Sequence, residues 1–155
     1  EAALRTAVEK LSGEELKSLD FTEVRGTEGI KEASYTVNGM EIKVCVVSGL
    51  ANANTIMEKV KNGTADYHFI EIMGCPGGCV NGGGQPIQHA VVRNFVDLRA
   101  RRAAALYEAD KDMPLRKSHE SEAVKRLYAE FLGEPGSHKA HEVLHTSYVA
   151  RPKYK

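Results

Sequence analysis

Apolar residues in the first part of the chain recur with spacings that predict a helix followed by short strands. Residues 1–11 place their apolar side chains on one side of a helix, at Ala2, Ala3, Leu4, Ala7, Val8 and Leu11. Residues 21–25 are predicted to form a short strand. Residues 33–37 and 41–47 flank Asn38-Gly39, a dipeptide typical of a two-residue hairpin turn, and therefore predict an antiparallel pair.

The next segment has the order strand, helix, strand. Residues 41–47 end in an almost continuous apolar run, as in a buried strand. Asn52 or Asn54 can cap a helix that runs to about residue 61, and residues 67–73 form another strand. Such a unit predicts two parallel strands joined by a right-handed crossover. The loop after residue 73 then lies at the carboxyl edge of the sheet, where α/β proteins bind ligands.

After Pro86 the pattern becomes helical. One helix is predicted over 88–107, with four arginines mostly on its wet side, at Arg93, Arg99, Arg101 and Arg102. A polar connector follows over 110–117, then a helix from Ser118–Glu122 to Gly133, and a short helix over 138–145 capped by Ser137. The predicted fold class is α/β, a mixed or parallel sheet containing a βαβ unit and flanked by helices, with an α-helical C-terminal tail. We predict two domains, residues 1–87 and 88–155.

Bulk composition narrows the class of protein. The 155 residues include 21 basic and 21 acidic side chains, and this balance argues against a nucleic-acid or anionic-membrane partner. No apolar run approaches the roughly 20 residues of a membrane span. Three cysteines do not make a disulfide framework, and two of them are clustered, which fits a reducing compartment with a metal site. Because nothing in the sequence resembles a signal peptide, we expect a cytoplasmic location. The chain opens on Glu-Ala-Ala-Leu without Met, and we expect it to be a piece of a longer polypeptide.

The segment with the clearest chemistry is Cys75-Pro-Gly-Gly-Cys79-Val-Asn-Gly-Gly-Gly-Gln85. Its many glycines leave few side chains to pack and let the backbone approach another group closely. The C-x-x-x-C spacing differs from the C-x-x-C of zinc ribbons and thioredoxin-like sites. Two thiolates in this setting favour a metal or iron–sulfur cluster over two free thiols in a turn.

The stretch Glu71–Pro86 resembles, nearly residue for residue, the last signature motif of the [FeFe]-hydrogenases. The resemblance extends over essentially the whole chain, through residues 1–6, 47–53, 102–107, 114–120, 127–133 and 140–148. It implies the C-terminal lobe of the catalytic domain, followed by a helical tail like that family's small subunit. The implied reaction is reversible, 2H⁺ + 2e⁻ to H₂.

The resemblance also implies cofactors and residue roles. The family's H-cluster is a [4Fe–4S] cubane joined through a cysteine sulfur to a di-iron subsite that carries CO, CN⁻ and a bridging dithiolate. By resemblance, Cys75 ligates the cubane, Cys79 ligates it and bridges to the di-iron subsite, and Met73 lies beside that subsite. Spacing alone favours Met73 as a core residue at a strand end. Gly74 stands where the family usually has Ala.

Several parts of the family's site have no counterpart in this sequence. The family uses two further cubane cysteines, a proton-delivering cysteine and a lysine that contacts a cyanide, whereas the one other cysteine here, Cys45, lies in an apolar strand. We therefore expect the remaining N-terminal part of the hydrogenase, in the same or a separate chain, as partner. The resemblance also implies an electron carrier, such as ferredoxin or NAD(P)H through other subunits. The alternative is a hydrogenase-like iron–sulfur protein without the di-iron subsite, acting in sensing or cluster assembly.

Two further motifs carry weaker signals. His141-Glu142-Val-Leu-His145 matches the H-E-x-x-H pattern of zinc peptidases, but no His, Asp or Glu follows as a third ligand. We interpret it as a structural histidine pair. Gly82-Gly83-Gly84 precedes a predicted helix, yet it lacks the spacing of a phosphate-binding loop, and the neighbouring cysteines explain these glycines better.

Overall fold

A computed structural model describes residues 1–153, and the chain divides into two compact units, Glu1–Arg116 and Lys117–Lys155. The boundary at residue 116 separates compact units, whereas the boundary predicted at residue 87 comes from the sequence pattern. The first does not test the second, so the division at residue 87 stays a prediction. None of the helices in the described residues combines the length and apolar character needed to cross a membrane.

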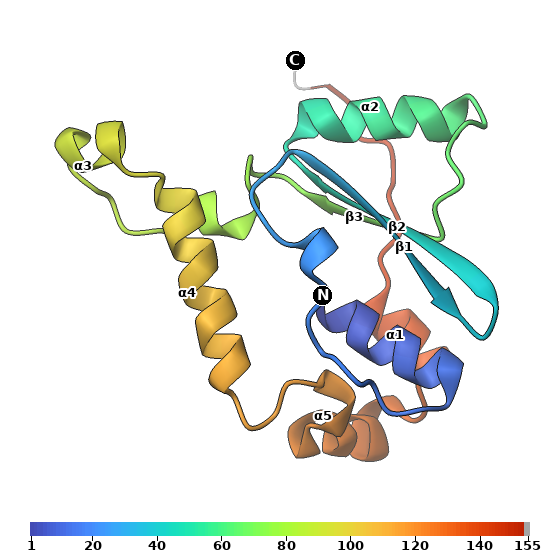
Figure 1. The fold of residues 1–155 in the computed structure, drawn as a ribbon. Helices are drawn as coiled ribbons and strands as arrows, with labels where there is room; N and C mark the ends of the chain where they lie inside the picture. The colour runs from blue at the N-terminus through green and yellow to red at the C-terminus, as the bar shows by residue number, and fades with distance from the viewer. Residues whose placement is uncertain (154–155) are drawn as a thin grey trace. The chain divides into compact units, whose positions relative to one another are not determined.

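The first unit is built on a mixed sheet in the order β1-β2-β3 (Figure 1). Strand β1 (Ile30–Val37) is antiparallel to β2 (Met40–Ser48), and β3 (Phe69–Met73) is parallel to β2. The hairpin turn uses Asn38 and Gly39, both with positive φ, as the dipeptide predicts. Helix α2 (Leu50–Lys61) connects the parallel strands. The predicted α/β class, with its βαβ unit, is confirmed.

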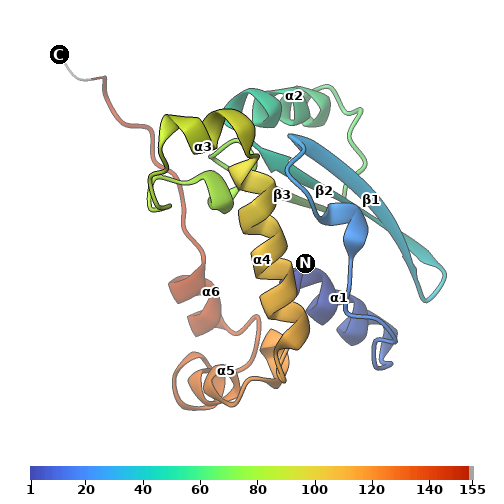
Figure 2. The ribbon, with the colours of Figure 1, turned by 60° about the vertical axis from the view of Figure 1, so that its left-hand side comes forward.

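Strand β2 is buried on both faces because it is the central strand. Its alternate residues Val44 and Val46 pack with Leu4 of α1 (Ala2–Ser12), whereas Cys45 and Val47 pack with Ala53 and Ile56 of α2; all are buried. Successive strand residues point to opposite faces, so one apolar run serves two cores. Figures 1 and 2 show α1 and α2 on opposite sides of the sheet.

The prediction of a strand over residues 21–25 was wrong. Thr22–Val24 forms a single 3₁₀ turn instead. Phe21 and Val24 are both buried in the core beside Val44 and Val46. Two residues three apart share one side of a 3₁₀ turn but lie on opposite faces of a strand, so burial of both favours the turn.

Helix α2 begins at Leu50, with Gly49 at its N-cap in place of the predicted Asn52 or Asn54. Gly49 has φ 85°, a conformation that a side chain disfavours. The Asn52 side-chain amide donates to the Ser48 carbonyl at 2.8 Å. The predicted end at Asn62-Gly63 is confirmed, with Gly63 at φ 66°.

The single helix predicted over 88–107 is in fact two helices, α3 (Ala90–Phe95) and α4 (Leu98–Asp112). Val96 is extended, and the Asp97 side chain accepts from the N–H groups of Arg99 and Ala100. Asp97 therefore caps a new helix in the middle of the predicted one. Helix α4 also continues through the first residues of the predicted polar connector.

The second unit consists of short helices. Ser118–Glu120 forms a 3₁₀ turn, α5 covers Glu122–Leu127, and a π-helical turn continues it over Tyr128–Leu132. The chain leaves this helix at Gly133, which has φ 79°, as predicted. Helix α6 (His138–Leu144) begins after Ser137, whose hydroxyl accepts from the Ala140 N–H at 3.1 Å, so the predicted cap is confirmed.

Candidate metal centre

The Cys–Gly loop leaves the sheet where the parallel strands β2 and β3 both end. Ser48, the last residue of β2, lies opposite Met73, the last residue of β3. The Gly49 N–H donates to the Met73 carbonyl at 2.9 Å, and the Gly77 N–H donates to the Ser48 hydroxyl at 3.0 Å. The predicted position at the carboxyl edge is therefore confirmed: the first bond joins the ends of the two strands, and the second fastens the loop to that edge.

Glycine is required at the tip of the loop for steric reasons. Gly77 and Gly78 have φ of 79° and 85°, in the left-handed region. A Cβ on Gly78 would lie 3.0 Å from the Met73 sulfur. Without that atom, the Met73 thioether can lie directly against the backbone of the loop.

Hydrogen bonds within the loop hold the segment that carries both cysteines. The Gly78 N–H donates to the Cys75 carbonyl at 2.9 Å. The side chains of Asn81 and Gln85 donate to the carbonyls of Pro76 and Cys79, at 3.1 and 3.3 Å. The Cys79 carbonyl also accepts from the Gly82 N–H at 3.0 Å in a 3₁₀ turn over Cys79–Asn81. These bonds pair the backbone of the loop, so it is fixed although it has few packing side chains.

Arg102 of α4 secures the far side of the loop. Its guanidinium donates to the Val80 carbonyl at 3.1 Å and to the Pro86 carbonyl at 2.7 Å. Val80 itself is buried. The wet face predicted for Arg102 is therefore wrong, because this half-buried side chain spans the two ends of the glycine segment.

A charged network positions α4 against α1. Arg5 is 4% exposed and donates to both carboxylate oxygens of Asp110 at 2.7 Å, and Arg116 donates to the same carboxylate at 2.7 Å. The hydrogen bond from Arg5, followed by that from Arg116, holds the pKa of Asp110 well below its usual range. Since α4 carries Arg102, this network indirectly supports the loop.

The cysteines occupy different environments. Cys79 is exposed, Cys75 is half-buried, and Cys45 is fully buried in the core beside α2. All three thiols are free of disulfides. Burial raises the pKa of the Cys45 thiol, which disfavours the thiolate that a metal needs. The two loop thiols and the Met73 thioether form a soft donor set, which suits iron–sulfur chemistry.

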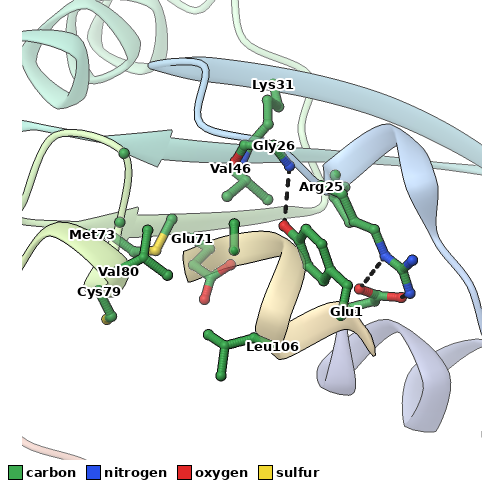
Figure 3. Close-up of a pocket in the computed structure, with 15 residues that line it drawn as sticks. Glu1, Arg25, Gly26, Lys31, Val46, Glu71, Met73, Cys79, Val80 and Leu106 are labelled. Carbon is green, nitrogen blue, oxygen red and sulfur yellow. Dashed lines mark hydrogen bonds and ion pairs between the residues drawn. The ribbon is translucent and has the colours of Figure 1, made fainter. Parts of the chain in front are cut away.

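A cavity of about 180 Å³ opens beside the loop (Figure 3). Met73 and Cys79 both line it, whereas Cys75 does not. The structure therefore brings two of the three predicted site residues to one cavity. Four charged side chains also line it, namely Glu1, Arg25, Lys31 and Glu71.

The charged residues around the cavity differ in how they are paired. Glu1 and Arg25 form an ion pair at 2.7 Å. Lys31 is 8% exposed and donates to the Gly26 carbonyl at 2.9 Å. Burial lowers the pKa of the Lys31 ammonium, and the carboxylates of Glu71 and Glu28 oppose that effect. The cavity is therefore lined by one ion pair, by Lys31, which has no carboxylate at ion-pair distance in the described residues, and by the exposed carboxylate of Glu71.

Sequence reasoning did not single out Ser48, Arg102 or Lys31 as part of this site. Each is separated from the cysteines by at least twenty residues, and none belongs to a local motif. Arg102 has the spacing of an exposed helix face, and Lys31 precedes the strand predicted over 33–37, whereas β1 begins at Ile30. Only the fold, by bringing the ends of β1, β2 and α4 to the loop, assigns them to the site.

The H-E-x-x-H histidines belong to the second unit. The rings of His141 and His145 stack, with centroids 4.2 Å apart and an interplanar angle of 29°. In the part of the chain that the structure describes, no third His, Cys, Asp or Glu joins both at ligand distance. This agrees with the interpretation as a histidine pair.

The α/β unit presents two free thiols on a glycine-rich loop at its carboxyl edge, and cysteine thiolates are the usual ligands of iron–sulfur clusters. The family model described as "Iron only hydrogenase large subunit, C-terminal domain" matches residues 1–83, and the one described as "Iron hydrogenase small subunit" matches residues 96–151. The chain therefore belongs to the iron-only, or [FeFe], hydrogenase family, whose members bind iron–sulfur cofactors.

Individual relatives agree with this assignment. The chain is 45% identical over 153 residues to the NADP-reducing hydrogenase subunit HndD of Solidesulfovibrio fructosivorans, covering 99% of this chain and 25% of that protein. It is 35% identical over 150 residues to a probable cytosolic Fe-S cluster assembly factor of Aedes aegypti, covering 96% and 30%. The chain thus spans between a quarter and a third of these relatives.

Solved structures share the fold. The [FeFe]-hydrogenase HydA1 from Chlamydomonas reinhardtii matches with a TM-score of 0.73 and 40% identity, over 96% of this chain and 43% of that one. At this identity the likeness extends beyond the fold to the family.

Proposed function

We propose that this chain forms the C-terminal part of an [FeFe]-hydrogenase active site and takes part in the reversible reaction 2H⁺ + 2e⁻ to H₂. The observation that carries the proposal is the Cys75–Cys79 loop, fastened to Ser48 on one side and to Arg102 on the other. A loop with two free thiols, few packing side chains and this many anchors is suited to holding a rigid cofactor.

The proposed residue roles follow the donor set. Cys75 and Cys79 would ligate the [4Fe–4S] cubane, and Cys79 would also join it to the di-iron subsite. The Met73 thioether, which lines the same cavity as Cys79, would lie beside that subsite. When bound, the H-cluster supplies the redox-active irons at which protons and electrons combine. The chain contributes thiolate ligands and a cavity wall.

The remaining ligands are proposed to come from the N-terminal part of the hydrogenase, in the same or a separate chain. Within the described residues, the third cysteine, Cys45, is buried on the far face of the sheet and is not available for the cluster. An electron carrier, ferredoxin or NAD(P)H through other subunits, would exchange electrons with the site. The similarity to an NADP-reducing hydrogenase subunit supports the second route. A cytoplasmic location is part of the proposal.

The second candidate is an iron–sulfur protein of cluster assembly or sensing that lacks the di-iron subsite. The observation in its favour is the 35% identity to a probable cytosolic Fe-S cluster assembly factor. Infrared spectra of the anaerobically purified, complete protein distinguish the two functions. Bands of iron-bound CO and CN⁻ together with H₂ evolution support the hydrogenase, and iron without these bands supports the alternative.

The test of the site uses single cysteine variants of the complete protein. We expect Cys79→Ala to lose the CO and CN⁻ bands and H₂ evolution, because its thiolate is the proposed link to the di-iron subsite. The matched control is Cys45→Ala, which removes a thiol from the core and should keep both iron and activity. Full activity in Cys79→Ala would contradict the proposal.

A further inference from the structure

One row of side chains crosses all three strands beneath the cavity. Lys31 of β1 lies opposite Val46 of β2, and Val46 lies opposite Glu71 of β3. Directly opposed residues point to the same face of a sheet, so Lys31 and Glu71 share one face with Val46 between them. Figure 3 shows the three side chains at the cavity, together with Met73 and Cys79.

The ammonium of Lys31 is buried with little local compensation. The side chain is 8% exposed, and its nitrogen donates to the Gly26 carbonyl at 2.9 Å. In residues 1–153, no carboxylate lies within ion-pair distance of it. An ammonium carries more N–H donors than this one bond uses, and the side chain lines the cavity.

The row lies next to the proposed metal ligands. Met73 is two residues beyond Glu71 on the same strand and therefore on the same face, and Cys79 lines the same cavity as Lys31. The other charges there, Glu1 and Arg25, are paired with each other at 2.7 Å. Lys31 and Glu71 are therefore the two cavity charges outside this ion pair, and their opposite signs should have opposite effects on a group bound at Cys79.

We propose that Lys31 raises the reduction potential of the cluster bound at Cys75 and Cys79, and that Glu71 lowers it. The inference rests on the proposed function, because it concerns the group held there. Adding an electron makes an iron–sulfur cluster more anionic, and a fixed cation nearby stabilises that state. Lys31 is buried, so its charge is screened less by water than that of Glu71, which is exposed. Neither side chain needs to touch the cofactor.

The experiment is an anaerobic potentiometric titration of the complete, iron-loaded protein, followed by electron paramagnetic resonance. Lys31→Met is expected to shift the midpoint to a more negative potential, so that a several-fold smaller fraction of cluster is reduced at the wild-type midpoint. Lys31→Arg keeps the charge and should restore the wild-type midpoint. Glu71→Gln should shift it in the positive direction. The control is Lys61→Met, an exposed lysine at the end of α2, with no expected shift.

The outcomes separate this inference from the proposed function. Equal midpoints for Lys31→Met and Lys61→Met, in protein that binds iron, would overturn the inference and leave the proposed function intact. A wild-type protein without iron would overturn both. If Lys31→Met fails to accumulate, Glu71→Gln decides alone, and an unchanged midpoint there overturns the inference.

Discussion

The two faces of strand β2 are built differently although they share one backbone. The face toward α2 is an apolar core, in which Cys45, Val47 and Ile56 are completely buried. The opposite face is apolar near α1, but toward the loop it opens into the cavity that Lys31 and Glu71 line. The face toward α2 therefore contributes packing, whereas the loop end of the opposite face forms the candidate site.

Cys45 and Cys79 show how the surroundings determine the role of a cysteine. Cys45 lies in the α2 core, where burial raises the pKa of its thiol, whereas Cys79 is exposed on the loop. Both residues have the same side chain, so only the surroundings distinguish a packing group from a candidate ligand. Counting cysteines therefore says less about the site than locating them on the sheet.

The largest expected effect comes from breaking the α2 core. Ile56 is fully buried, so Ile56→Ala should lower the free energy of unfolding by about 4 kcal/mol, through lost burial and the cavity left behind. Urea denaturation measures the change. The matched control is Met57→Ala on the same helix, where the side chain is 42% exposed and the loss should be below about 1 kcal/mol. Similar losses for the two variants would show that this face is not a close-packed core.

The next effect concerns the ionic support of α4. Asp110→Asn removes the closer of the two carboxylates that pair with the buried Arg5, leaves Glu1 at 3.2 Å, and should cost about 3 kcal/mol at neutral pH. Asp112→Asn, an exposed change on the same helix, is the control.

The same network predicts a pH dependence. Because the folded-state pKa of Asp110 is depressed, its stabilisation is present above the unfolded-state pKa of about 3.9 and is lost as the pH falls below that value. Urea denaturation between about pH 5 and pH 2 should therefore show a steeper loss of stability in the wild type than in Asp110→Asn. Parallel curves would contradict this role.

A smaller effect is expected at the tip of the loop. Gly78→Ala places a methyl group 3.0 Å from the Met73 sulfur at a φ of 85°, and should cost about 1–2 kcal/mol. In the complete protein we expect reduced iron content, because the loop must shift. Gly83→Ala is the control, since its Cβ would meet nothing within 4 Å. Equal iron content in the two variants would argue against a fixed loop.

The smallest effect comes from a single hydroxyl. Ser48→Ala removes the acceptor of the Gly77 N–H and should cost about 1 kcal/mol. Amide hydrogen exchange at Gly77 should become faster, while Ser34→Ala, on the exposed side of β1, should leave it unchanged. Unaltered exchange in Ser48→Ala would mean that other contacts alone hold the loop.

Sequence patterns predicted the sheet better than its surroundings. Asn38-Gly39 and the apolar run to Val47 determined the hairpin and the parallel strand correctly, because turn chemistry and strand burial are local properties. The break at Val96–Asp97 was missed because apolar spacing continues across it, although an aspartate before a helical segment is a capping signal. Residues 21–25 were misassigned because alternation over so few residues does not distinguish a strand from a 3₁₀ turn.

The candidate site was predictable only in its local part. Cys75, Cys79 and their glycines form one continuous motif, and the βαβ pattern placed that motif at the carboxyl edge. Arg102 and Ser48 contribute through contacts between distant segments, which a single sequence does not reveal. The roles of Cys75, Cys79 and Met73 at a cluster stay predictions until iron is measured.

The position of Ser48 has a consequence for how the site assembles during folding. Its N–H donates to the Gly29 carbonyl, its carbonyl accepts from Asn52, and its hydroxyl accepts from Gly77. A shift of one residue between β2 and β3 would replace the hydroxyl beside Gly77 with the side chain of Val47 or with Gly49, and neither can accept a hydrogen bond. Misregistered chains would therefore lack an ordered ligand loop, so cofactor insertion would select correctly folded molecules.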